Sequence, residues 1–233
     1  MPKWPIFAIR LILKNEVKTI LYIHGMGGGS DSRIPSILRE ALCHPLSDQG
    51  SDIRVVCRTN SFDPELATVQ ISSWVEELKP DLVIGESLGS LHALRIKGVP
   101  HILISPALNA PLYFEALAWL VLIPGVSWLF GRIYKPREGD RQPLHFTFPI
   151  LRKYRRHRRQ ALASSPCLGG TDSVHAFIGT RDHYLRTAIV SRRTYKKYFG
   201  ETVTLYDGTH FTEEEYVRSL VIPKILEVLD INK

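Results

Sequence analysis

A serine between two glycines occupies a position where its hydroxyl could act as a nucleophile. The segment Gly85-Glu86-Ser87-Leu88-Gly89 directly follows an apolar run and precedes an apolar pattern with helical spacing. A turn this tight between a strand and a helix admits only small residues two positions before and after the serine, which Gly85 and Gly89 satisfy. The pattern predicts that Ser87 lies at the N-terminal, electropositive end of a helix.

A serine hydroxyl is a weak nucleophile at neutral pH, so acyl transfer needs a base and a group that orients the base. An apolar run over residues 174–179 is followed by Asp182, and a run over residues 202–206 is followed by His210. In a sheet of parallel strands these positions fall near the same edge as Ser87. We therefore expect His210 to be the general base and Asp182 the carboxylate that orients it.

Two rival residues compete for these roles. His183 adjoins Asp182 in the same loop, but a histidine next to its own orienting carboxylate in sequence would not normally point back at it. Asp207 is the rival acid, and its alternative role is that of a turn residue before Gly208. Most of the remaining histidines fall in predicted helices, strands or an insertion, which favours His210; these are His92, His101, His145, His157 and His175.

The first predicted strand runs into a glycine-rich loop within the stretch Ile20 to Ser30. It lacks both the lysine of a phosphate-binding P-loop and the full Gly-x-Gly-x-x-Gly pattern. A strand followed by His-Gly-x-Gly is also typical of the loop that contributes to the oxyanion hole of lipases and esterases. We assign the oxyanion hole to the backbone N–H groups of Met26 and Leu88. The residues expected to shape this loop, with His24 structural rather than a base, are His24, Gly25 and Gly27.

The elements that must position these residues alternate between strands and helices. The predicted strands are nearly continuous apolar runs, as in a parallel sheet covered on both faces. Right-handed crossovers then give a doubly wound, three-layer α/β/α sandwich. Ile6 to Leu13 could add an edge strand. The six predicted strands are Thr19–His24, Ile53–Cys57, Leu82–Gly85, His101–Ser105, Val174–Gly179 and Thr202–Tyr206.

Two helices carry clear boundary signals. Asp63, followed by proline, predicts the start of one helix, and Lys79-Pro80 predicts its end. Thr212 and Glu215 have the three-residue spacing of a capping box, which predicts the start of the last helix. Pro223 would kink that helix before its end near residue 229.

Residues 109–166 interrupt the alternation within a single domain of residues 1–233. This insertion has no clear strand and is rich in Trp, Tyr, Phe and Pro. Leu112 to Phe130 is apolar enough to raise the question of a membrane span, but Glu115 and Pro124-Gly125 lie inside it. We expect instead a lid of two apolar helices over the mouth of a pocket, followed by a basic helix.

Composition restricts the class of protein further. A chain of 233 residues with 44% hydrophobic residues can bury one sizeable core. The three cysteines are irregularly spaced, which suits neither a disulfide framework nor a zinc site and favours a reducing compartment. Arg10 interrupts the apolar N-terminal stretch, so we do not expect a secretory signal. We expect a cytoplasmic location. We expect no metal and no cofactor.

The net charge of +7 is concentrated in one segment, residues 152–159, which holds six Lys or Arg. This basic run is either a solvated helix face or a patch for anionic lipid or an acidic substrate. No nucleic-acid-binding motif accompanies it, so nucleic acid is not an expected partner.

The sequence resembles the α/β-hydrolase superfamily, and within it small bacterial intracellular esterases. The segments that carry the resemblance are the His24-Gly25-Met26-Gly27 loop, the serine pentapeptide, Ile104-Ser105-Pro106-Ala107 and His210. The resemblance implies that Ser87 is the nucleophile, Asp182 the acid and His210 the base. It also implies that the substrate is a small-molecule carboxylic ester, cleaved through an acyl-enzyme.

Three other functions stay open on the same residues. A thioesterase acting on acyl carriers would suit the basic run, since such carriers are anionic. A small amide hydrolase would use the same three residues. The third is a binding protein that keeps the fold without turnover, although its usual mark is a degraded set of catalytic residues.

Overall fold

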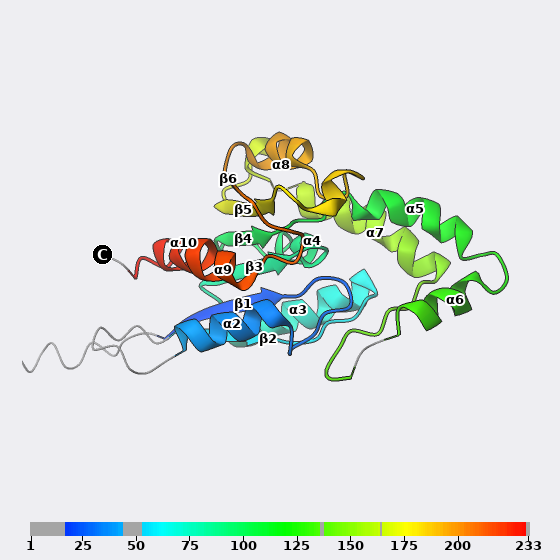
Figure 1. Ribbon diagram of the computed structural model, residues 1–233, viewed down its shortest axis with the longest axis horizontal. Helices are drawn as coiled ribbons and strands as arrows, with labels where there is room; N and C mark the ends of the chain where they lie inside the picture. Colours follow the sequence, from blue (N-terminus) through cyan, green and yellow to red (C-terminus); the bar gives the residue numbers. More distant parts are fainter. Residues whose placement is uncertain (1–16, 44–52, 136–137, 164, 232–233) are drawn as a thin grey trace, which may run out of the picture.

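The computed structural model describes residues 17–43, 53–135, 138–163 and 165–231 (Figure 1). The predicted edge strand Ile6–Leu13 lies outside these residues. All six other predicted strands are present, with ends that differ by at most one residue. They are β1 (Lys18–Ile23), β2 (Ile53–Cys57), β3 (Leu82–Glu86), β4 (His101–Ile104), β5 (Val174–Gly179) and β6 (Val203–Tyr206).

The six strands form one parallel sheet in the order β2-β1-β3-β4-β5-β6. The chain first adds β2 on one side of β1 and then adds β3 and the later strands on the other side. The direction of winding therefore reverses between β1 and β3. The loops after these two strands are the loop of Met26 and the turn of Ser87, so both candidate elements flank the switch point where ligands bind in open α/β sheets.

Alternate side chains of the strands pack into two separate cores. Ile20 and Ile84 join the core under α2 (Arg33–Leu42) and α10 (Ile222–Val228). Leu21 and Val83 join the larger core on the other face, under α3 (Pro64–Leu78), α4 (Gly89–Ala93) and α8 (Arg192–Phe199). Because both faces of the sheet are covered, the strands read as continuous apolar runs. The predicted three-layer α/β/α fold is confirmed.

The helix α3 begins and ends where its boundary signals predict. Asp63 is the N-cap, and its carboxylate accepts a hydrogen bond of 3.0 Å from the backbone N–H of Glu65. The proline at the first helical position loses no hydrogen bond there. Lys79 closes the helix in the left-handed region, at φ 44°, directly before Pro80.

The predicted capping box of the last helix is wrong. Thr212 lies before the N-cap at φ 46°, and its buried hydroxyl forms a hydrogen bond of 2.6 Å with the hydroxyl of Tyr206. Glu213 is the N-cap of α9 (Glu214–Tyr216), and its side chain accepts hydrogen bonds from the backbone N–H of Thr209. The threonine therefore anchors the loop to the end of β6, which a local spacing rule does not detect.

The C-terminal helix continues from α9 through a π-helical turn, η3 (Val217–Val221), into α10. Pro223 lies at the start of α10 and has no N–H to donate into the preceding turn. The irregularity expected at Pro223 thus takes the form of a wider turn immediately before it.

The insertion forms helices between β4 and β5, at the end of the molecule opposite α10 (Figure 1). They are α5 (Ala110–Leu120), α6 (Val126–Ile133) and α7 (Phe148–Leu162). Gly125, at φ 87°, separates α5 from α6. Within the described residues, no helix combines the length and the apolar character that a membrane crossing requires.

Most side chains of the basic run on α7 form ion pairs or hydrogen bonds with neighbouring segments. Arg152 and Arg155 both pair with Glu115 of α5. Lys153 pairs with Asp63 at the start of α3 at 2.6 Å, and Arg158 donates to the backbone carbonyl of Leu108 and to the side chain of Asn109. The run therefore holds α7 against α3 and α5, in addition to giving this end of the molecule its charge.

Three buried histidines lie on the face of the sheet that α4 and α7 cover. His101 donates a hydrogen bond of 3.0 Å to the carbonyl of Ala93, and the Nδ1 of His157 accepts one of 2.8 Å from Arg95. Burial disfavours the charged imidazole. It lowers the pKa of His101 to about 4 and that of His157 to about 3, and it places the pKa of His92 well below its ordinary value.

These pKa values predict a loss of stability in mild acid. Below about pH 6.5 the unfolded chain protonates His157 whereas the folded chain does not, so the free energy of unfolding falls by up to about 1.4 kcal/mol per pH unit for each such histidine. We expect His157→Gln to reduce the stability difference between pH 7 and pH 5 by about 2 kcal/mol. Urea unfolding at the two pH values measures this, with the exposed His145→Gln as the control. Equal pH dependence in both variants would contradict the assignment.

Candidate active site

Ser87 occupies the sharp turn between β3 and α4. Its backbone lies in the left-handed region at φ 49°, which is costly for a residue with a Cβ. The end of β4 holds this conformation, because the N–H of Ser87 donates to the carbonyl of Ile104 at 2.8 Å and its carbonyl accepts from the N–H of Ala107 at 3.1 Å. The strained turn keeps the side chain above the edge of the sheet.

The two glycines around Ser87 lie in close backbone contacts. A Cβ at Gly85 would lie 2.7 Å from the Cα of Ser90, and a Cβ at Gly89 would lie 2.4 Å from the carbonyl oxygens of Ile23 and His24. The steric requirement predicted for both positions is therefore present. At Gly89 the obstacle is the end of β1, so the first turn of α4 packs directly on the start of the glycine-rich loop.

The side chains of Ser87, His210 and Asp182 form a continuous hydrogen-bonded line. The Nδ1 of His210 lies 2.7 Å from Oδ2 of Asp182, and its Nε2 lies 3.0 Å from Oγ of Ser87. Since a carboxylate only accepts, Nδ1 carries the proton and Nε2 is left to accept from the serine hydroxyl. The Asp182 side chain is fully buried and that of His210 is 6% exposed.

Local contacts hold the acid and the imidazole in place. The second carboxylate oxygen of Asp182 accepts a hydrogen bond of 2.8 Å from the N–H of Tyr184, at the start of η2 (His183–Leu185). The ring of Tyr184 meets the ring of His210 edge-on, with centroids 4.6 Å apart. Glu213 accepts two hydrogen bonds from Thr209, the residue before His210. Tyr184 and Glu213 were not predicted, because their contacts depend on loop conformation.

The structure separates the rival residues from this line. The ring of His183 packs against that of Tyr184 in a tilted arrangement with centroids 4.0 Å apart, and its centroid lies 5.9 Å from that of His210. The side chain of Asp207 is 76% exposed and pairs with Arg181 at 3.1 Å. Neither residue contributes a hydrogen bond to Ser87 or His210 within the described part of the chain.

The two backbone groups assigned to an oxyanion hole lie beside Ser87. Met26 and Leu88 both line the cavity that contains Ser87 and His210. Among the hydrogen bonds of the described residues, none uses the N–H of Met26 or of Leu88 as its donor. The two donors are therefore available to an oxygen atom bound next to the serine.

His24 lies below the loop and has a structural environment. It is buried, its Nδ1 donates to the carbonyl of Gly25 at 2.7 Å, and its Nε2 accepts from the N–H of Asn60 at 3.2 Å. Burial lowers its pKa, which keeps the ring neutral as this pairing requires. Gly25 passes close to the serine, since a Cβ there would lie 3.1 Å from the Cβ of Ser87.

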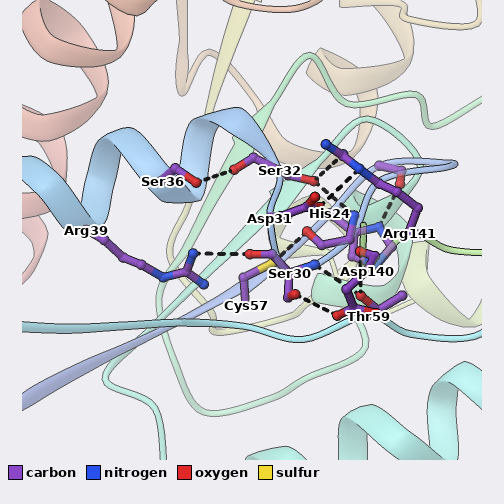
Figure 2. A network of polar contacts seen from close by, with 12 residues as sticks. His24, Ser30, Asp31, Ser32, Ser36, Arg39, Cys57, Thr59, Asp140 and Arg141 are labelled. Atoms are coloured by element: carbon purple, nitrogen blue, oxygen red, sulfur yellow. Dashed lines mark hydrogen bonds and ion pairs between the residues drawn. The ribbon is translucent and has the colours of Figure 1, made fainter. Parts of the chain in front are cut away.

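A segment of the insertion clamps the glycine-rich loop (Figure 2). Ser30 donates to the carboxylate of Asp140 at 2.6 Å, and Arg141 pairs with Asp31 at 3.0 Å. Gly29 and Arg141 form an isolated antiparallel bridge. A Cβ at Gly29 would lie 1.6 Å from the carbonyl oxygen of Asp140, so this approach requires glycine.

Gln142 extends the clamp to the residue next to Met26. Its Oε1 accepts a hydrogen bond of 3.1 Å from the N–H of Gly27, and its Nε2 donates to the carbonyl of Asn60 at 2.9 Å. The N–H of Gln142 also donates to the carbonyl of Gly28 at 2.7 Å. Nothing in the spacing of the sequence indicates this residue, because it lies about 115 positions from the loop and belongs to no strand.

The cavity above Ser87 has a volume of about 610 Å³ and a lining of mixed character. Apolar side chains come from α5 and from the loops after β4 and β5, and they include Ala107, Ala110, Phe114 and Ile189. Polar side chains of the lining include Glu86, Arg141 and Gln142. Among the described residues, no group of three or more His, Cys, Asp or Glu side chains is arranged to hold a metal ion.

No family model matches this sequence, and no curated protein matches it. Solved structures do match over nearly the whole chain. Est1E from Butyrivibrio proteoclasticus, with bound ferulic acid, is 16% identical, has a TM-score of 0.59 and covers 94% of this chain and 92% of its own. A thermophilic esterase from Thermogutta terrifontis with bound malate is 13% identical, with a TM-score of 0.59 over 93% of this chain and 91% of its own.

A bromoperoxidase from Bacillus anthracis is similar to the same degree, with 14% identity and a TM-score of 0.57 over 93% of both chains. These neighbours share the α/β-hydrolase fold, and the chain described here has that fold as well. The resemblance predicted from sequence is thereby confirmed at the level of the fold. Since the neighbours include an esterase and a peroxidase, the reaction has to be argued from the site.

The close approach at Gly89 predicts a specific loss of stability. Gly89→Ala would press a methyl group against two carbonyl oxygens of the backbone, and we expect the free energy of unfolding to fall by at least about 2 kcal/mol. Gly131→Ala in α6 is the matched control, since a Cβ there meets nothing within 4 Å. Urea unfolding of both variants measures the difference. A Gly89→Ala protein as stable as Gly131→Ala would show that the packing of α4 on β1 is looser than described.

Proposed function

We propose that the protein is a serine hydrolase that cleaves a small-molecule carboxylic ester through an acyl-enzyme. The observation that carries the proposal is the line from Asp182 through His210 to Ser87, with hydrogen bonds of 2.7 Å and 3.0 Å. The line ends at a strained serine that faces a cavity and has two unpaired backbone donors beside it. Each part has a separate role in acyl transfer.

In the first half of the reaction, Oγ of Ser87 attacks the carbonyl carbon of the ester while its proton passes to Nε2 of His210. The carbonyl oxygen becomes an oxyanion next to the N–H groups of Met26 and Leu88. Asp182 stabilises the imidazolium that forms. The imidazolium then protonates the leaving alkoxide, the C–O bond breaks, and the acyl group stays on Ser87.

In the second half, water attacks the acyl carbon and gives its proton to His210. The tetrahedral intermediate collapses, the bond to Oγ breaks, and Ser87 recovers its proton as the carboxylic acid leaves. The insertion acts as the lid in this scheme. Phe114 of α5 supplies an apolar surface against which the acyl or alcohol group of the substrate can pack.

The contacts that the basic run makes within the protein favour an oxygen ester over an anionic thioester as the substrate. Arg152, Lys153, Arg155 and Arg158 form ion pairs or hydrogen bonds with groups of α3, α5 and the loop before α5. None of these four lines the cavity of Ser87. A phosphate-bearing acyl carrier would have to compete with those contacts for the same cations.

Replacing the proposed nucleophile or acid tests the mechanism. We expect Ser87→Ala and Asp182→Asn each to lower kcat/KM for p-nitrophenyl esters by roughly a thousandfold or more, because either change breaks the proton path. A panel of esters of increasing acyl length measures both the activity and the preferred substrate. A fluorophosphonate probe should label Ser87 in the wild type and leave Ser87→Ala unlabelled.

The rival residues provide matched controls, since His183→Gln and Asp207→Asn remove the same functional groups nearby. We expect these variants to keep kcat/KM within about fivefold of the wild type, because neither side chain hydrogen-bonds to Ser87 or His210. Wild type and Ser87→Ala that are equally inactive, together with an unlabelled wild type, would exclude the proposed hydrolase.

Gln142 is proposed as a positioning residue for the oxyanion loop. Gln142→Leu removes the acceptor for the N–H of Gly27, the residue next to Met26. We expect kcat to fall by about tenfold with KM changed little, because the loop acts on the oxyanion rather than on the bound ester. Steady-state kinetics on one ester separates the two parameters. Gln142→Glu, which keeps an acceptor, should recover part of kcat, whereas a merely structural role predicts no recovery.

A further inference from the structure

The end of the insertion exposes an unusual number of large apolar side chains. We call this surface the apolar tip and define it by the exposed large apolar residues of α5, of α6 with its C-cap Tyr134, and of the loop between the two helices. Three of its side chains are 60% exposed or more, namely Trp119, Trp128 and Ile133. The remaining members are Leu112, Tyr113, Leu120, Leu122, Ile123, Leu129 and Tyr134.

Exposed large apolar residues elsewhere in the described chain occur singly or in pairs, as Leu66 and Val69 do on α3. Isolated residues of that kind are ordinary on a protein surface. The apolar tip differs because its members are close together in sequence and lie on helices that form one end of the molecule (Figure 1). Exposed apolar side chains grouped at one end of a molecule are typical of a site that contacts a membrane or another protein.

The charge of the molecule is concentrated in the same insertion. Residues 109–166 contain ten Lys or Arg against three Asp or Glu, a net charge of +7, which equals the net charge of the whole chain. Beside the apolar tip, the guanidinium of Arg132 lies 5.6 Å from the ring centre of Trp128, and Arg152 lies 5.9 Å from that of Phe148. Tryptophan with flanking Lys and Arg is the combination favoured at the surface of an anionic bilayer.

The apolar tip also borders the cavity of Ser87. Ile133 and Tyr134 belong to the tip and line that cavity, together with Lys135. The exposed side chains of Met26 and Phe211 line the same cavity. A surface that covered the tip would therefore adjoin the cavity that contains the serine.

We propose that the apolar tip docks on the surface of an anionic lipid bilayer, with its apolar side chains in the interfacial layer and the neighbouring Arg132 and Lys135 at the lipid headgroups. On the proposed function, the substrate is then an ester of an amphiphile that resides in that surface and enters the cavity beside Ile133 and Tyr134. A second copy of the chain is a poorer partner, because a symmetric contact would bring the two +7 insertions together.

Sedimentation with sucrose-loaded vesicles tests the docking. We expect the wild type to bind vesicles of phosphatidylcholine with phosphatidylglycerol, and to bind pure phosphatidylcholine at least about tenfold more weakly. High salt should weaken the binding, since screening acts on the ionic part. Ser87→Ala should bind as the wild type does, so docking is measured independently of hydrolysis.

Matched double variants identify the surface. Ile123→Ser with Trp128→Ser should lower the partition coefficient on anionic vesicles by at least about tenfold, because both side chains would leave the bilayer interface. Leu66→Ser with Val69→Ser removes apolar side chains of comparable exposure from α3 and should change it by less than about twofold. Arg132→Gln with Lys135→Gln should remove most of the preference for phosphatidylglycerol.

The Ile123→Ser with Trp128→Ser variant and the Leu66→Ser with Val69→Ser variant should hydrolyse a soluble p-nitrophenyl acetate at the wild-type rate, since neither alters a residue that lines the cavity of Ser87. A wild type that does not hydrolyse p-nitrophenyl acetate would overturn the proposed hydrolase. The vesicle experiment would still test the docking, because it does not depend on hydrolysis. Two results would overturn the docking. One is a wild type that stays in the supernatant with anionic vesicles, and the other is an Ile123→Ser with Trp128→Ser variant that pellets as well as the wild type. Self-association through the same side chains without vesicle binding would also overturn it and make the tip a protein interface.

Discussion

The contact between the first turn of α4 and the end of β1 is the constraint on which the rest of the site depends. Gly89 lies so close to the carbonyls of Ile23 and His24 that no side chain fits between them. This approach brings the loop of Met26 beside the turn of Ser87, and the strained φ of the serine follows from the same tight turn. The hydroxyl and both available N–H groups therefore have their relative positions set by backbone packing, before any side chain is considered.

That dependence on backbone geometry explains why the central residues could be predicted from sequence. Ser87, Asp182 and His210 each follow a run of β-branched and aliphatic residues that predicts a strand, and parallel strands end at a common edge. Because β3, β5 and β6 are parallel strands of one sheet, the three residues that follow them lie at that edge. Local rules with clear steric causes were also reliable, as at Asp63, where the cap and the following proline fix the start of α3.

The sequence was uninformative where a contact joins distant segments without a strand between them. Gln142 and Asp140 clamp the glycine-rich loop, but they come from a part of the insertion that has no periodicity to reveal its place. The capping box at Thr212 failed for a related reason. In the fold, its hydroxyl forms a hydrogen bond with the hydroxyl of Tyr206. This tertiary contact outweighs the local preference of threonine for capping a helix. Conformational detail in loops depends on such partners, which a spacing rule does not include.

The distribution of charge adds a last constraint on how the site meets its surroundings. Outside residues 109–166 the chain holds twenty Lys or Arg and twenty Asp or Glu, so the rest of the sequence is neutral in sum. The field of the protein is then one-sided and strongest on the insertion, which also supplies a wall of the cavity of Ser87. An anionic surface approaching by diffusion is drawn to that side first. The segments that hold the proposed catalytic residues lie in the part of the chain whose charges cancel, whereas residues 109–166 carry a net charge equal to that of the whole chain.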